Sequence, residues 1–150
     1  MKKIVLIGTY VLLSSCFSID ESQKTFCLDN GRCITVWKSL NDVCYIIPGK
    51  YSSLNLPIRN SYIQTSNTND VDIIWPDSSE NIIVNTREEI KINDVGKDYK
   101  IEKYSQDPLR NDSMFMTFDG KYHRYKSNVS YISLHIKEFY AIDNNGKRFP

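Results

Sequence analysis

Apolar and polar residues alternate with a period of two along much of the chain. In the clearest stretch, residues 129–136, bulky apolar residues occupy one side and more polar residues the other. The apolar side carries Ile132, Leu134 and Ile136, and the opposite side carries Tyr131, Ser133 and His135. Such alternation is typical of a β-strand that buries one face.

Shorter runs of β-branched and aromatic residues, each bounded by turn-forming residues, predict further strands. These runs are residues 33–38, 43–47, 61–65, 71–75, 81–85, 88–93, 99–104, 114–118 and 121–125. We expect residues 138–142 to extend the strand at 129–136. The spacing of Ile132, Ile136 and Phe139 also fits a short helix, so a helix there is the alternative.

The pattern therefore predicts a mainly β fold. We expect a single compact antiparallel β-sandwich or barrel-like domain built from hairpins, with one short helix near the C-terminus as the alternative to a last strand. Composition agrees, because the chain has 18 Ile but a single Ala, Ala141, and β-branched residues favour strands. A length of 150 residues suits one domain rather than two.

Charge narrows the choice of partners. The formal net charge is +1, and basic and acidic residues are mixed without a long run of one sign. This distribution lacks the basic surface of a nucleic-acid-binding protein, so we expect no nucleic-acid partner.

The N-terminal segment has the layout of an export signal. Met1 is followed by Lys2 and Lys3, an apolar run over residues 4–13 and then small residues before Cys16. This order is typical of a signal peptide. The apolar run is about half of the roughly 20 residues that a membrane-spanning helix needs, so we do not expect a transmembrane anchor.

The stretch Leu13-Ser14-Ser15-Cys16 resembles the lipobox of bacterial lipoproteins. The resemblance implies that Cys16 is acylated and becomes the first residue of the mature chain. Residues 1–15 would then be the signal peptide, 16–25 a lipidated tether and 26–150 the β-rich domain. Phe17 stands where an aspartate tends to retain lipoproteins at the inner membrane, and its presence favours the outer membrane.

An exported chain meets an oxidising compartment, so the remaining cysteines are disulfide candidates. A two-residue turn between Cys27 and Cys33 would place them on opposite faces of a hairpin. A three-residue loop over 29–31, with Gly31 in the left-handed conformation, would place them directly opposite each other. We expect this loop, a Cys27–Cys33 disulfide and Cys44 as a buried free thiol.

No short catalytic, phosphate-binding or metal-binding signature occurs in the sequence. A nucleophile–base pair of Cys44 with His123 or His135 is conceivable, but the apolar run around Cys44 favours a structural thiol. We therefore expect no catalysis, no cofactor and no metal. The expected function is a non-catalytic binding module for a glycan or protein partner in the cell envelope, with membrane contact through the lipid anchor only. The alternatives are an inhibitor or immunity-type protein against a toxin or hydrolase, and an envelope hydrolase with dispersed catalytic residues.

One group of side chains is a candidate binding surface. A two-residue turn at Asp119 and Gly120 would pair Met116 with His123 and leave several aromatic and cationic residues on the opposite face. With the following strand they would form one patch: Phe115, Tyr122, Arg124, Tyr131 and His135. Aromatic rings beside an arginine suit stacking on a sugar or anchoring of a protein partner.

Overall fold

The computed structural model describes residues 23–53, 55–77, 79, 81–95, 99–104, 115–118, 122–125 and 129–150, the ranges 115–118 and 122–125 by their backbone alone. These residues form thirteen strands and no helix. The strands are β1 (Gln23–Cys27), β2 (Cys33–Lys38), β3 (Val43–Pro48), β4 (Tyr62–Ser66), β5 (Asp70–Pro76), β6 (Ile82–Asn85), β7 (Lys91–Asn93), β8 (Ile101–Lys103), β9 (Phe115–Phe118), β10 (Tyr122–Tyr125), β11 (Val129–His135), β12 (Tyr140–Asp143) and β13 (Arg148–Phe149). None of the described segments forms a helix that is long and apolar enough to cross a membrane.

Two larger sheets and one hairpin contain these strands. The first sheet has the order β1-β2-β3-β4-β7, the second has the order β13-β12-β11-β5-β6-β8, and β9 with β10 forms the hairpin. The expected antiparallel β fold is confirmed, and β8, parallel to β6, is the one exception among the described strands. Between β6 and β8 the chain crosses to the first sheet, where β7 pairs with β4. It then returns to the second sheet, so β8 runs in the same direction as β6.

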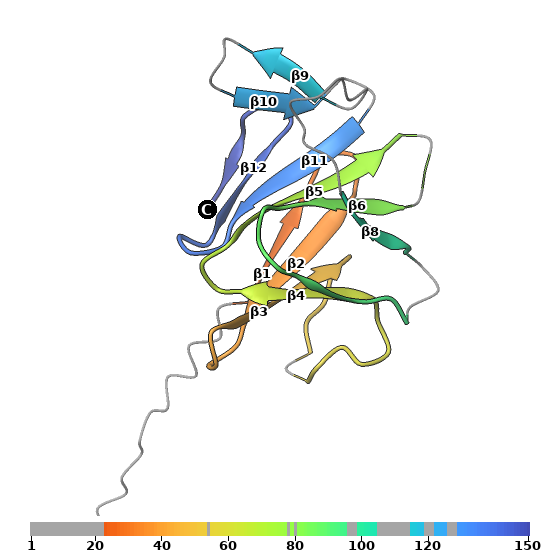
Figure 1. Cartoon of the computed structure of the whole chain (residues 1–150), viewed down its shortest axis with the longest axis vertical. Helices are drawn as coiled ribbons and strands as arrows, with labels where there is room; N and C mark the ends of the chain where they lie inside the picture. The colour runs from red at the N-terminus through yellow and green to blue at the C-terminus, as the bar shows by residue number, and fades with distance from the viewer. Residues whose placement is uncertain are drawn as a thin grey trace, which may run out of the picture.

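The two sheets pack face to face, and Figure 1 shows β1 and β2 of the first sheet crossing behind β5 and β11 of the second. One apolar core lies between them. Its members from the first sheet include Ile34, Val36, Ile46 and Ile63, and those from the second include Val71, Ile73, Ile132 and Leu134. Burying each such side chain contributes about 1.5–3 kcal/mol, so this shared core holds the sandwich together.

The predicted alternation in β11 is confirmed. Ile132 and Leu134 are fully buried between the sheets, and on the outer face Ser133 donates a 2.7 Å hydrogen bond to Asp72 on the adjacent strand β5.

Residues 138–142 neither extend the strand before them nor form a short helix, because a tight turn separates β11 from the antiparallel strand β12. The backbone N–H of Phe139 donates to the carbonyl of His135 at 2.8 Å, and Phe139 has a φ of +60°. This left-handed residue reverses the chain. Ile136 and Phe139 are both apolar because both contact the core, Ile136 as a member and Phe139 as a partly buried neighbour. Their spacing therefore matches a helix without one being formed.

The folded domain begins earlier than the sequence predicted. Gln23 pairs with Trp37 as the first residue of β1, and its side chain donates to the carbonyl of Tyr51 at 2.6 Å. The last three residues of the predicted tether, 23–25, therefore belong to the sheet. The rest of the tether and the signal segment, including Cys16, lie outside the described residues.

The predicted register of the β9–β10 hairpin is wrong by one residue. His123 pairs with Thr117 instead of Met116, and Tyr125 pairs with Phe115. A single additional residue in the connection accounts for the change, and a shift of one residue exchanges the two faces of one strand relative to the other.

Candidate functional site

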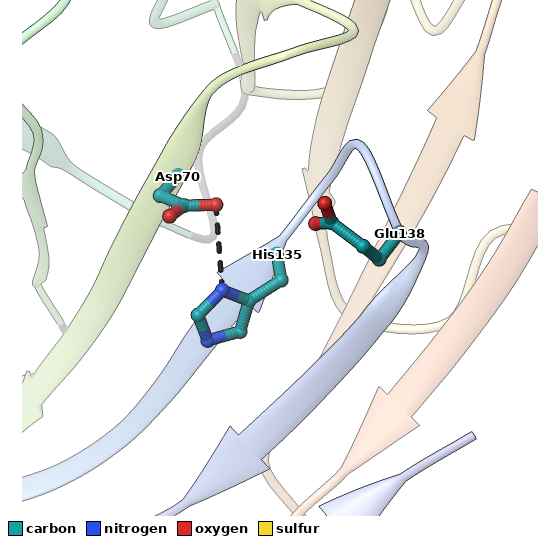
Figure 2. Close-up of side chains that lie close together, drawn as sticks. All are labelled: Asp70, His135 and Glu138. Carbon is teal, nitrogen blue, oxygen red and sulfur yellow. Dashed lines mark ion pairs between the residues drawn. The ribbon is translucent and has the colours of Figure 1, made fainter.

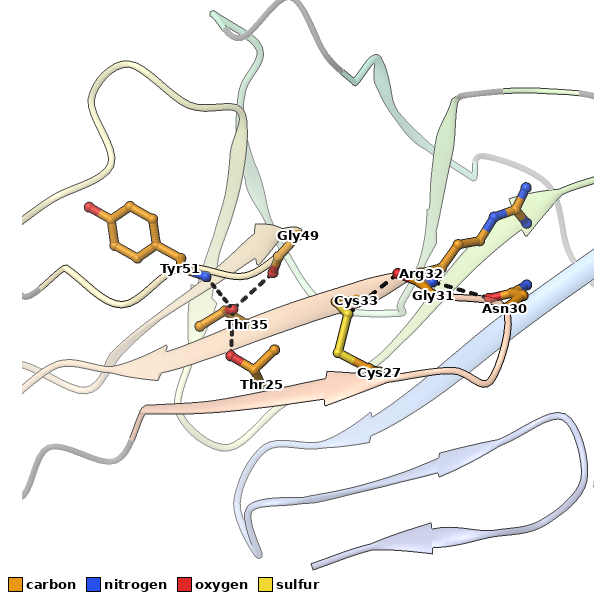
Figure 3. The surroundings of a disulfide bond; sticks show 9 residues. All are labelled: Thr25, Cys27, Asn30, Gly31, Arg32, Cys33, Thr35, Gly49 and Tyr51. Atoms are coloured by element: carbon orange, nitrogen blue, oxygen red, sulfur yellow. Dashed lines mark hydrogen bonds between the residues drawn. A yellow bond between two sulfur atoms is a disulfide. The ribbon is translucent and has the colours of Figure 1, made fainter.

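The disulfide loop at one end of the sandwich has the conformation that the sequence predicts. Cys27 and Cys33 are directly paired in the β1–β2 register and form a disulfide, shown in Figure 3. The backbone N–H of Leu28 donates to the carbonyl of Arg32 at 2.8 Å, closing a three-residue loop. Gly31 has a φ of +84°, a conformation that glycine adopts without steric cost.

This loop also connects the two sheets. The Asn30 side chain accepts from the backbone N–H of Arg32 at 3.2 Å and donates to the hydroxyl of Ser130 on β11 at 3.0 Å. The Arg32 guanidinium donates to the carbonyl of Trp75 on β5 at 3.2 Å. The same guanidinium nitrogen lies 3.9 Å from the largely exposed carboxylate of Asp77.

A buried hydroxyl positions the chain after β3. Thr35 is fully buried, and Figure 3 shows its Oγ1 at the centre of three hydrogen bonds. It donates to the carbonyl of Gly49 at 2.9 Å and accepts from the backbone N–H of Tyr51 at 3.0 Å. These bonds fix the backbone on both sides of Lys50.

Together these segments surround a pocket of about 360 Å³. The disulfide loop, the Gly49–Lys50 corner and the end of β5 form its walls. The residues that line it include Asn30, Arg32, Lys50, Trp75, Ser79 and Tyr99. Gly49 has a φ of +82°, and the Tyr99 hydroxyl lies 3.9 Å from where its Cβ would be, so a side chain there would be strained and would reduce the pocket.

The pocket combines two cations with aromatic and amide groups. Lys50 makes no hydrogen bond or ion pair within the described residues, and Arg32 retains free N–H donors. Cations, amide donors and aromatic rings are the groups that bind anionic or hydroxyl-rich ligands.

One residue of the predicted patch, Tyr131, lies in the interior. Tyr131 is only 9 % exposed, because it packs with Ile74 and Val129 in a second apolar cluster. The β9–β10 register pairs Arg124 with Met116 and Tyr125 with Phe115.

The other predicted patch residues are placed only in part. His135 is half-buried on the outer face of β11, whereas the side chains of Phe115, Tyr122 and Arg124 lie outside the described part of the structure.

Cys44 has the expected character. It is a free cysteine with none of its surface exposed, and burial raises the pKa of its thiol to about 12, against a small opposite effect of Lys38. The thiol is therefore protonated at neutral pH, whereas a nucleophilic cysteine needs a lowered pKa. The proposed pairing of Cys44 with a histidine base gains no support.

His135 does have carboxylates beside it, which the sequence analysis missed. Its Nδ1 lies 3.4 Å from Oδ1 of Asp70, and Glu138 lies near both (Figure 2). The Asp70 side chain is 66 % exposed, so this group lies on an open strand face and not in a cleft suited to hydrolysis. No local signal in the sequence could have found it, because Asp70 comes from a distant strand.

None of the protein-family models, curated proteins or solved structures compared with this chain matches it.

Proposed function

We propose that the chain is an exported lipoprotein, anchored through Cys16, that acts as a non-catalytic binding module for a glycan or protein partner in the cell envelope. The pocket beside the disulfide is the binding site of this proposal. The observation that carries it is the convergence of Arg32, Lys50 and Tyr99 from three separate segments on one cavity.

The charges of the pocket favour a ligand with an anionic group. Both cations are supported by the fold, Arg32 through its bond to the Trp75 carbonyl and Lys50 through the hydrogen bonds of Thr35 to its neighbours. Asp77 offsets part of the charge of Arg32. An acidic sugar or an acidic segment of a protein partner fits these donors, because carboxylates form charge-assisted hydrogen bonds with arginine and lysine.

A photoreactive benzoylphenylalanine in place of Ser79, in bacterial cells that produce the full chain, tests the pocket, because Ser79 lines it and both cations stay in place. We expect a discrete crosslinked product from position 79 and none from position 91, because Lys91 is exposed on β7 and does not line the pocket. Mass spectrometry of the adduct distinguishes a glycan from a peptide. Equal crosslinking from both positions, or none from position 79, would refute binding at this pocket.

Metabolic labelling with an alkyne-bearing fatty acid tests the anchor. The wild-type chain should be labelled and should sediment with membranes, because a diacylated cysteine supplies the two chains that stable attachment requires. The Cys16→Ser variant should lose both properties. A wild-type chain that is exported without label would contradict the lipoprotein proposal.

A further inference from the structure

Three side chains meet at the end of the second sheet opposite the disulfide loop. Asp70 and His135 are direct cross-strand partners in the β5–β11 register, and Glu138 belongs to the turn that follows β11. Figure 2 shows the two carboxylates on either side of the imidazole. One potential ligand atom from each residue lies within 4.8 Å of the other two.

The separation of Asp70 and His135 suits a shared metal ion better than a direct bond. The Nδ1–Oδ1 distance is 3.4 Å, longer than a charge-assisted hydrogen bond of about 2.7–2.9 Å. Two ligands bound at about 2.0–2.1 Å in a tetrahedral zinc site are about 3.4 Å apart. The cross-strand pair therefore already has the spacing of two zinc ligands.

The imidazole is held in place from the side away from Asp70. Its ring stacks on Tyr140, with ring centroids 4.5 Å apart and an interplanar angle of 17°. Stacking restricts the tilt of the imidazole ring, which keeps the ring edge near the carboxylates. The exposed Glu138 side chain makes no hydrogen bond or ion pair within the described residues, so it can rotate toward an ion without losing a contact.

The nearby cations are engaged elsewhere. The Arg148 guanidinium stacks on the Tyr140 ring at 3.8 Å, and the order β13-β12-β11 places that ring between Arg148 and His135. The Lys38 ammonium donates to the carbonyl of Lys137 at 3.0 Å and lies over the Phe139 ring. These two cations reduce the negative potential around the two carboxylates, and neither of them occupies the site.

From these contacts we infer that Asp70, His135 and Glu138 bind a divalent transition-metal ion of the zinc class. One imidazole nitrogen and two carboxylate oxygens are donors that zinc accepts, whereas calcium and magnesium prefer oxygen alone. A fourth position would remain open to water or to an outside ligand. The inference is independent of the pocket and departs from the expectation from the sequence that no metal is bound.

Calorimetric titration of the untagged full chain with zinc chloride tests the site. We expect one zinc per chain, with affinity about tenfold lower in Glu138→Gln, since a neutral amide is a poorer ligand than a carboxylate. The control Glu102→Gln removes the same charge from β8 and should bind zinc like the wild type. Glu138 is exposed, so its substitution should leave the fold intact.

A second measurement locates the ion. The chain has two histidines, so a His135→Gln variant assigns the imidazole resonances in an NMR spectrum. Zinc should shift the signals of His135 and leave those of His123 unchanged, and it should raise the melting temperature of the wild type more than that of Glu138→Gln. Absence of saturable binding, or binding that Glu138→Gln and His135→Gln leave unchanged, would overturn the inference.

Discussion

The thiol of Cys44 makes stability depend on pH in an unusual range. Burial raises its pKa from an ordinary value of 9.0 to about 12, so between these values the folded chain holds a proton that the unfolded chain has released. This contribution to stability is complete below pH 9 and is lost as the pH rises toward 12. Raising the pH from about 8 to about 10 should lower the free energy of unfolding by about 1 kcal/mol through this group.

Urea unfolding of the wild type and of Cys44→Ala at both pH values measures this contribution. The pH-dependent loss should be smaller in the variant by that amount, because alanine has no proton to release. Identical pH dependence in the two chains would show that the thiol titrates normally.

Asn144 is a second single residue on which the fold depends. Its side chain accepts from the backbone N–H of Tyr131 at 2.6 Å and donates to the carbonyl of Val129 at 2.7 Å. Asn144→Ala leaves both backbone groups unpaired and should cost about 2 kcal/mol in urea unfolding. The neighbouring control Asn145→Ala should change stability by no more than about 0.5 kcal/mol. Equal effects of the two substitutions would refute this role of Asn144.

At the scale of elements, the β1–β2 hairpin relies on its disulfide. Loop closure predicts that replacing Cys27 and Cys33 together with alanine costs about 2 kcal/mol, because the enclosed loop is short. The melting temperature of the double variant, compared with that of the wild type, measures the loss. An unchanged melting temperature would mean that the hydrogen bonds of the loop suffice to hold the hairpin.

Local pattern was enough to predict most strands and the disulfide loop. The boundaries of β2 agree with the prediction, and Gly31 has the predicted left-handed conformation, because alternation and turn residues are properties of short segments. The β9–β10 register was wrong because a loop longer by one residue leaves the flanking pattern unchanged. The turn at Phe139 was missed because its left-handed conformation occurs at a residue that rarely adopts it.

At the scale of the molecule, contacts between distant segments determine both candidate sites. Asp70 reaches His135 only through the pairing of β5 with β11, and Arg32 reaches Trp75 only because the two sheets meet. Strand order and sheet packing of this kind have no signature in a local pattern. The sequence could therefore supply His135 as a candidate residue but not its carboxylate partners, and it could not reveal the pocket.

The single core shared by the sheets predicts that they unfold together. Each sheet carries one tryptophan: Trp37 contacts Tyr45 in the first, and Trp75 is buried in the second. Replacing either tryptophan with phenylalanine leaves a fluorescent reporter of the other sheet. In each variant, the fluorescence transition in urea should coincide with the circular dichroism transition, because a sheet that lost its partner would expose its half of the core to water. A fluorescence change that precedes the loss of strand signal in one variant would show that the two sheets unfold separately.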